Sequence, residues 1–298
     1  MHLPTMSHRP RDDSGRGLRA LLAGVLCVCA LAACTTSLVY PRLDTLLGLY
    51  VRGLVTLEDE QSRQLSRTLE RNLDWHRRDE LRRYDAWLQE FARSIATGLD
   101  RAALDDAVAE AETHGRRLLA QLAPGYIELA TTLTDRQVRE LLENLEREDE
   151  KTWLEHSQRT SAERFEARER AVRRQVERIT GPLTVAQRAI VREYAWSARP
   201  FMFEWRENRR RWREQLAATL PLRTGPAEVF NARMRVLLVE PDSLWTPEYR
   251  AALATSRAEL LDLLLQLDAT LSEKQRTRAE RRLLALAGEL RDLAQRRG

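Results

Sequence analysis

The 46 residues from Thr134 to Ile179 contain neither proline nor glycine. Both residue types interrupt helices, so their absence predicts one long helix over about residues 134–180, about 70 Å long at 1.5 Å per residue. Its ends carry apolar residues at helical spacing, whereas residues 155–170 are nearly all polar, with Phe165 as the single large apolar side chain. Because such a polar helix bridges through solvent or is held by a partner, we expect a charged helical arm that projects from the fold.

Apolar residues recur at helical spacing elsewhere too. Leu65, Leu69 and Leu73 share one stripe, and Leu81, Tyr84 and Leu88 repeat it next to Trp87. The last two helices are indicated by Leu260, Leu261, Leu264, Leu265 and Leu267, and by Leu283, Leu284, Leu286, Leu290 and Leu293. The alternation typical of strands is almost absent, so we predict an all-α fold, an irregular helical bundle. Glycine and proline concentrate at residues 181–247, which predicts shorter helices and turns there.

Four copies of a Leu-X-X-X-Gln pattern begin at Leu57, Leu133, Leu183 and Leu271, and three of them have Thr or Ser as the second residue. Thr or Ser at a helix N-cap followed three residues later by Gln is typical of a capping box, with the leucine as a hydrophobic staple. The pattern predicts helix starts near residues 58, 135, 185 and 273. In the first copy Thr56 is the candidate cap.

Charge excludes one class of partner. The chain has 49 Lys+Arg and 45 Asp+Glu, and the first 33 residues contribute four of the arginines and two of the aspartates. The remaining chain is therefore close to neutral, with charges of both signs interspersed. A nucleic-acid-binding protein needs clustered positive charge, so we expect no nucleic-acid partner.

The N-terminal 33 residues have the parts of a secretory signal. Four arginines precede an apolar stretch, residues 20–33, that is too short to span a bilayer as a helix. Small residues then precede Cys34 in the sequence Leu-Ala-Ala-Cys. The alternatives are an ordinary signal peptide with an incidental cysteine, or a retained N-terminal helix. All three cysteines lie at or before residue 34, so the rest of the chain has no disulfide and depends on its own core.

Leu31-Ala32-Ala33-Cys34 resembles the lipobox of bacterial lipoproteins. The resemblance implies that Cys34 is acylated, with palmitate-type chains, and becomes the mature N-terminus, which attaches the protein to a membrane. Thr35 follows the cysteine where an aspartate would imply the inner membrane, so the resemblance implies the outer membrane, facing the periplasm. The predicted organisation is a signal peptide (1–33), a lipid-anchored tether with a first short helix (34–56) and one helical domain (57–298).

Candidate catalytic residues are few. His76 and Glu80 share a helix face, but no paired metal-ligand spacing exists, so we interpret His76 as structural and expect no metal and no cofactor. An acidic run could instead supply carboxylates to a glycan-acting enzyme. It consists of Glu140, Glu143, Glu146, Glu148, Asp149 and Glu150. Such a run is more often a solvated helix face, so we expect no enzyme, and keep the cell-wall glycan enzyme as the alternative.

The segment from Tyr194 to Arg213 combines tryptophans with arginines and is the candidate binding surface. Its predicted partner-binding residues are Trp205, Arg206, Arg209, Arg210, Trp212 and Arg213. Such a surface could bind anionic headgroups or a client protein through cation–π and charge-assisted contacts. The competing interpretation is a bundle helix whose aromatic side chains are core and whose arginines face water.

Two family resemblances follow from these motifs. The lipobox, Trp75-His76-Arg77-Arg78 and the Arg/Trp-rich helix together resemble a family of uncharacterised Gram-negative lipoproteins, which implies location and a helical fold. The copies at Leu133 and Leu183 resemble the Leu-Thr-X-X-Gln motif of Spy/CpxP-like periplasmic proteins, which implies chaperone-like client binding. We therefore expect a non-catalytic envelope lipoprotein that binds other macromolecules. A passive structural tether is a further hypothesis.

Overall fold

The computed structural model describes residues 40–296, and every regular element in them is a helix. The α-helices are α3 (Leu43–Leu54), α4 (Asp59–Trp75), α5 (Leu81–Thr97), α6 (Arg101–Thr131), α7 (Asp135–Ser157), α8 (Ser161–Thr180), α9 (Val185–Ser197), α10 (Met202–Thr219), α11 (Ala227–Val239), α12 (Pro247–Asp268) and α13 (Glu273–Gln295). Short turns of helix are η1 (Tyr40–Arg42), η2 (His76–Glu80), η3 (Leu220–Thr224) and η4 (Pro241–Leu244). The all-α prediction is confirmed. The signal segment and Cys34 lie outside the described residues.

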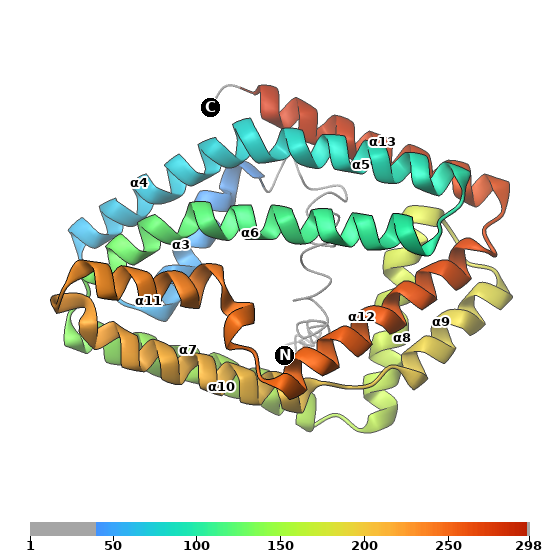
Figure 1. Cartoon of the computed structure of the whole chain (residues 1–298). Helices are drawn as coiled ribbons and strands as arrows, with labels where there is room; N and C mark the ends of the chain where they lie inside the picture. Colours follow the sequence, from blue (N-terminus) through green and yellow to red (C-terminus); the bar gives the residue numbers. More distant parts are fainter. Residues whose placement is uncertain (1–39, 297–298) are drawn as a thin grey trace, which may run out of the picture.

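The helices are arranged as an elongated frame (Figure 1). Helices α4 and α5 run along one long edge, and α7 and α10 run along the opposite edge. Helix α6 runs lengthwise between the two edges, while α8, α9 and α12 make the end of the frame farthest from α11. No helix in residues 40–296 combines the length and hydropathy needed to cross a membrane.

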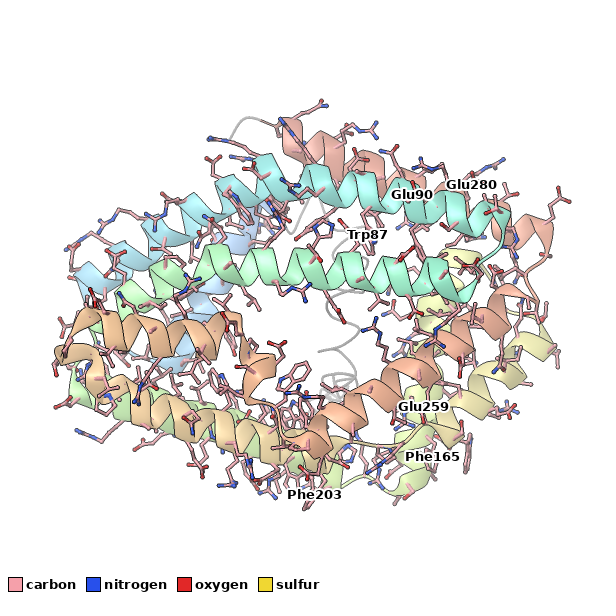
Figure 2. All side chains as sticks on the ribbon, viewed as in Figure 1. Trp87, Glu90, Phe165, Phe203, Glu259 and Glu280 are labelled. Carbon is pink, nitrogen blue, oxygen red and sulfur yellow. The ribbon has the colours of Figure 1, made fainter. Side chains whose placement is uncertain are left out.

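Helices α5 and α13, from opposite ends of the chain, pack along their full lengths. Their shared core includes Leu88 on α5 and Leu283 and Leu290 on α13, each buried. Figure 2 places Trp87 of α5 toward α6, whose His114 ring lies 6.2 Å from the Trp87 ring. The predicted leucine stripes of α5 and α13 are thus largely confirmed. The exception is Leu284, which is exposed because it points away from α5.

The apolar core is divided among several clusters along the frame. The second large cluster joins α6, α7, α10 and α11 around the fully buried Phe230. A third joins α8, α9 and α12 around Val191, and a fourth joins the start of α10 to α12 around Phe201 and Tyr249. Leu65 and Leu69 of α4 meet α6 in a fifth. Because each cluster lies between different helices, every edge of the frame has its own apolar contacts.

The four predicted capping boxes are present, and they begin α4, α7, α9 and α13 at residues 59, 135, 185 and 273. Thr134, Thr184 and Ser272 are the N-caps of the last three. The expectation for Thr56 is wrong. Glu58 is the N-cap of α4, whereas the Thr56 hydroxyl donates to Glu140 on α7, 2.5 Å away. The first box therefore starts two residues later than a Thr cap would place it.

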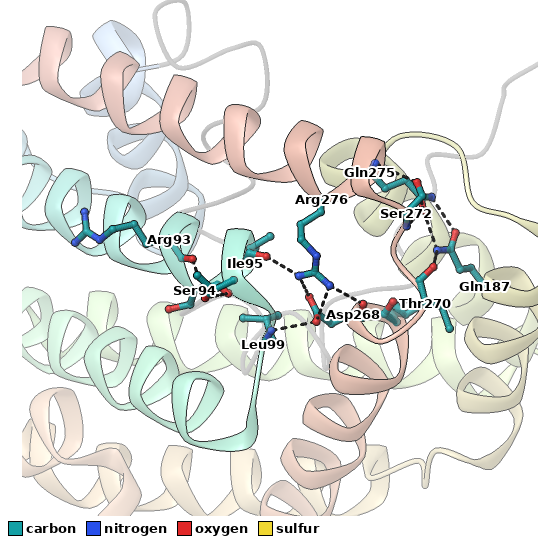
Figure 3. Close-up of polar contacts among 12 residues, drawn as sticks. Arg93, Ser94, Ile95, Leu99, Gln187, Asp268, Thr270, Ser272, Gln275 and Arg276 are labelled. Carbon is teal, nitrogen blue, oxygen red and sulfur yellow. Dashed lines mark hydrogen bonds and ion pairs between the residues drawn. The ribbon is translucent and has the colours of Figure 1, made fainter.

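The capping glutamines also bind one another in pairs. Gln61 and Gln137 exchange Nε2–Oε1 hydrogen bonds of 3.1 and 2.7 Å, which joins the starts of α4 and α7. Gln187 and Gln275 exchange bonds of 3.0 and 2.9 Å and join α9 to α13 (Figure 3). All four side chains are buried. Both pairs therefore fix two helix starts side by side through polar contacts, in addition to the neighbouring apolar cores.

The backbone contacts of the two pairs are equivalent. Each Nε2 also donates to the carbonyl oxygen five residues before the partner glutamine, over distances of 2.8 to 3.1 Å. The carbonyls belong to Thr132, Thr56, Thr270 and Pro182. Each Oε1 accepts the N–H of its own N-cap residue as well. A buried amide is costly unless it is hydrogen-bonded, and here every donor and acceptor is used.

The predicted single helix over residues 134–180 is wrong. Helix α7 ends at Ser157 and α8 begins at Ser161, with Thr160 as its N-cap. Thr160 and Glu163 form a fifth capping box, in which the Thr160 N–H donates to Glu163 Oε2 over 2.7 Å. This local signal interrupts the helix without proline or glycine. The arm does not project either, because α7 packs on α10 and α8 packs on α9.

A buried ion pair joins the two turns at one end of the frame (Figure 3). Arg276 of α13 donates to both carboxylate oxygens of Asp268, over 2.8 and 3.0 Å, and to the Ile95 carbonyl at the end of α5. Asp268 Oδ2 also accepts the N–H of Leu99 over 3.0 Å. The α5–α6 turn is therefore held against the α12–α13 turn.

Candidate functional site

The two predicted binding tryptophans of α10 lie in two different cores. Trp205 packs beside Phe201, Tyr249 and Trp245, where α10 meets α12. Trp212 lies two turns further on, in the core of α7 and α11, and its Nε1 donates to the Leu237 carbonyl over 3.0 Å. These side chains therefore position α10 within the frame. They do not form one continuous aromatic surface.

Three of the predicted arginines pair with the acidic run on α7. Asp149 Oδ1 accepts a hydrogen bond from Arg209 Nε over 3.1 Å, and its other oxygen pairs with Arg213. Arg206 pairs with Glu150 over 2.8 Å. We call these five residues the charged seam. Asp149 is buried, and a buried charged group is costly unless it is paired and hydrogen-bonded, so the seam fixes α7 against α10.

Arg210 lies apart from the charged seam. It pairs with Glu207 over 2.7 Å and with Glu214, both on its own helix. The hydrogen bond from Arg210, assisted by Arg211, lowers the pKa of Glu207 to about 2. Arg210 also lines a surface pocket with Arg211, Glu214, Gln215 and Leu244. The six predicted residues are thus divided between two cores, an interhelical seam and this pocket.

Exposed aromatic side chains gather where α7 ends and α10 begins. The Trp153 ring lies 6.3 Å from the ring of Phe203 and 6.4 Å from the imidazole of His156. Phe203 is 72% exposed. Arg206, whose guanidinium lies 4.5 Å from the centre of the Trp153 ring, links these rings to the charged seam through a cation–π contact.

A second aromatic pair lies where α9 ends and α8 begins. Phe165 packs against Trp196 with ring centres 4.7 Å apart, and Trp196 is 56% exposed. Arg168 holds the end of α9 by donating to the carbonyls of Ala195 and Ala198, over 3.1 and 2.6 Å. Phe165 and Phe203 lie along the same lower edge of the molecule in Figure 2.

We call this group the aromatic corner. It comprises Trp153, His156, Phe165, Trp196 and Phe203. Several arginines lie near His156 in this group. Burial, and then the charges of Arg164, Arg159 and Arg168, hold the pKa of His156 below its ordinary value. Exposed rings among arginines are suited to hold a chain that has both apolar and acidic side chains.

The sequence pattern did not reveal the aromatic corner as a site. Phe165 stands out as the apolar residue of a polar segment, and Trp196 as the end of an aromatic run. Nothing in the spacing indicates that Trp153 meets Phe203, because they are 50 residues apart and the turns between α7 and α10 decide their contact. The site therefore depends on tertiary structure.

A buried polar cluster lies on the other long edge of the frame. Glu80 is fully buried at the end of the π-helical turn η2, and its Oε1 accepts from Arg117 Nε over 2.9 Å. His114 Nδ1 lies 3.4 Å from Glu80 Oε2, under the ring of Tyr84. His76 packs against this cluster and bonds Tyr40 Oη through Nδ1 over 3.0 Å, as a structural histidine would. The described residues contain no group of three side chains suited to a metal ion.

Comparison with known proteins gives one match. Residues 53–250, two thirds of the chain, match a family described as a family of unknown function (DUF6279). No curated protein and no solved structure matches the chain. The resemblance to Spy/CpxP-like proteins finds no support in these comparisons. The matched region extends from the end of α3 into α12 and contains both the charged seam and the aromatic corner. The chain therefore belongs to the DUF6279 family.

Proposed function

We propose that the protein is a lipoprotein of the cell envelope that holds another macromolecule at its aromatic corner. Attachment is through acylated Cys34, and the helical frame faces the periplasm from the outer membrane. The role is non-catalytic, as a chaperone-like or scaffolding surface. The N-terminal sequence supports the location, and the aromatic corner supports the binding role.

The exposure of Phe203 and Trp196 is the observation that carries the binding role. Apolar surface in water is unfavourable by about 25 cal/mol per Å², so rings exposed by 72% and 56% are costly to the free protein. Clustered exposed apolar side chains are typical of interaction sites. The charged seam holds α7 against α10, which carries Phe203, and Arg168 of α8 holds the end of α9, which carries Trp196, so both rings are presented by fixed helices.

The arginines near these rings indicate the chemistry of the partner. Arg159, Arg164 and Arg168 surround His156, which places positive charge beside the apolar rings. An incompletely folded or extended protein segment with apolar and acidic side chains would satisfy both features. Salt would weaken the charge-dependent part of such binding and leave the apolar part.

The glycan-acting enzyme receives no specific support from the contacts of the acidic run. Asp149 and Glu150 pair with arginines of α10, and Glu140 accepts from both the N–H and the hydroxyl of Thr56, over 3.0 and 2.5 Å. These contacts stabilise helix packing.

The test is suppression of the aggregation of an unfolding client protein by the full chain in lipid vesicles, at low and moderate salt. We expect suppression that weakens with salt. The Phe203→Ser/Trp196→Ser variant should lose most of it, whereas Val229→Ser, at a 47% exposed apolar residue of α11, should keep it. Equal suppression by the two variants, or none by the unmodified chain, would disprove client binding at the corner. Flotation of the chain with vesicles, lost in Cys34→Ser, tests the anchor separately.

A further inference from the structure

Helix α3 carries an apolar face that no other helix of residues 40–296 covers. Leu46, Leu49 and Tyr50 are exposed by 50%, 59% and 62%. They lie at positions i, i+3 and i+4, with Gly53 at i+7, so they share one face. Leu47, exposed by 38%, borders this face. Four of the eleven large apolar side chains exposed in residues 40–296 therefore lie on this 12-residue helix.

The opposite face of α3 is packed on the frame. Gly48 is buried beside Leu69 of α4, and Val51 joins the cluster of Leu65 and Leu69. A surface helix normally turns its apolar face to the core and its polar face to water. Helix α3 is apolar on both faces, and its outer face includes only Thr45 and Gly53 besides the apolar side chains and the flanking arginines.

Both ends of α3 are fixed to the frame. Before the helix, Tyr40 Oη bonds His76 Nδ1 over 3.0 Å. At its end, Asn144 Nδ2 of α7 donates to the Leu54 carbonyl over 2.8 Å. The outer face of α3 therefore has a fixed direction relative to α4 and α7.

The position of α3 in the chain indicates what covers its outer face. Only six residue steps separate Cys34 from Tyr40, which span at most about 20 Å even when fully extended. A lipid at Cys34 would therefore hold α3 close to the bilayer surface. The short connection places no such limit on the later helices. Arg42, which is exposed, lies beside the start of the apolar face, where it can meet lipid phosphates. Arg52 is exposed in the last turn of α3, with its guanidinium beside Gly48.

We propose that the Leu46–Leu49–Tyr50 face of α3 lies in the headgroup region of the bilayer that holds the Cys34 lipid. This inference rests on the proposed acylation of Cys34. An interfacial helix places its apolar side at the boundary of headgroups and acyl chains, with cationic side chains among the phosphates. Since α3 is fixed to α4 and α7, contact with the bilayer sets the orientation of the whole frame.

The test uses the absence of cysteine after residue 34. Leu49→Cys in the full chain, labelled with an environment-sensitive fluorophore, is bound to vesicles of phosphatidylethanolamine and phosphatidylglycerol with and without brominated acyl chains. Val185→Cys on α9, at an apolar residue exposed by 76%, is the matched control. We expect brominated lipid to lower the fluorescence at position 49 at least about twofold and to leave position 185 unchanged. Circular dichroism checks that both variants keep the helical fold.

Two readouts separate the inference from the proposed anchor. Vesicle flotation reports attachment, and quenching reports contact of α3. A chain that floats with equal, water-like fluorescence at positions 49 and 185 keeps the anchor and overturns the docking of α3. A chain that does not float overturns both. A third outcome is a probe at position 49 that is shielded from water but not quenched by brominated lipid, in a particle of doubled mass. This outcome would assign the face to a second copy of the chain and would also overturn docking on lipid.

Discussion

Gln137 lies between Gln61 and the Thr56 carbonyl, and its Nε2 donates to both, over 2.7 and 2.8 Å. Its Oε1 accepts from the Gln61 amide and from the Thr134 N–H. Three of these four hydrogen bonds connect the start of α7 to the start of α4 and the turn before it, and the fourth caps α7. The same arrangement recurs at Gln187 and Gln275, where it connects α9 to α13.

We expect Gln137→Leu to lower the free energy of unfolding by about 2 to 4 kcal/mol, because the Gln61 amide and the Thr56 carbonyl lose buried partners. The double variant Gln61→Leu/Gln137→Leu should lose less than the sum of the two single variants, since it leaves no orphaned side-chain amide. Urea unfolding of the three variants measures this coupling. Additive losses would contradict the cooperative pair.

Gly125 provides a second test, because a Cβ there would lie 2.3 Å from Thr68 Cγ2, where α6 crosses α4. Thr68 is buried and cannot move aside freely. We expect Gly125→Ala to lower the midpoint of thermal unfolding, at a cost of about 1 to 3 kcal/mol. Gly115→Ala, on the same helix with open space at its Cβ position, should raise the stability by up to about 1 kcal/mol. The two variants must therefore differ in sign.

The charged seam predicts an asymmetric response to loss of charge. Asp149→Asn leaves Arg209 and Arg213 without their shared carboxylate, so we expect a loss of about 1 to 3 kcal/mol in urea unfolding. Glu146→Gln removes a 73% exposed carboxylate that lies 3.9 Å from Arg213, and should cost less than about 0.5 kcal/mol. If the two changes cost the same, the seam is not what fixes α7 to α10.

Acid should destabilise the fold through His76. Burial lowers the pKa of His76 from 6.5 to about 4, against the opposing charge of Glu80. The unfolded chain therefore binds the proton first, and this contribution to stability is lost as the pH falls from about 6.5 to about 4. Between pH 7 and pH 5 we expect a loss of about 1 to 2 kcal/mol from this group.

His76→Gln is the control for this pH dependence. Other groups also titrate in this range. One is His156, because burial and the neighbouring arginines lower its pKa as well. The quantity to compare is therefore the change between pH 7 and pH 5 in each protein. The unmodified protein should lose more stability than His76→Gln over this interval. Equal losses would mean that His76 is solvated when the protein is folded.

Local signals in the sequence predicted the helices and most of their starts. Capping depends on residues three apart, so the boxes at Thr134, Thr184 and Ser272 could be read directly. The box at Thr160 has Glu163 in place of glutamine and no leucine before the cap, so the Leu-X-X-X-Gln pattern does not include it. The helix predicted over residues 134–180 is too long because a capping box can end one helix and begin the next where proline and glycine are absent.

Contacts between distant residues could not be predicted in the same way. Trp205 and Trp212 share a helix and a composition that suggested a surface, yet the frame buries them in different cores. The meeting of Trp153 with Phe203 requires three turns of the chain, between α7 and α8, α8 and α9, and α9 and α10, and the packing of α7 on α10. Helical periodicity states which side of a helix is apolar and leaves open which partner covers it.

The pairing of α5 with α13 has a consequence for how the protein is made. The residues that complete the core around Leu88 begin almost 200 positions later in the chain, at Ala279. Until the last helix is synthesised, the apolar side of α5 lacks its main native partner, and the part that α6 does not cover is open to aggregation. Such sequence-distant pairing corresponds to high contact order and slow folding, unlike the local pairing of most helical bundles. Removing only the final 25 residues should therefore leave a chain that can form its helices but cannot close its frame.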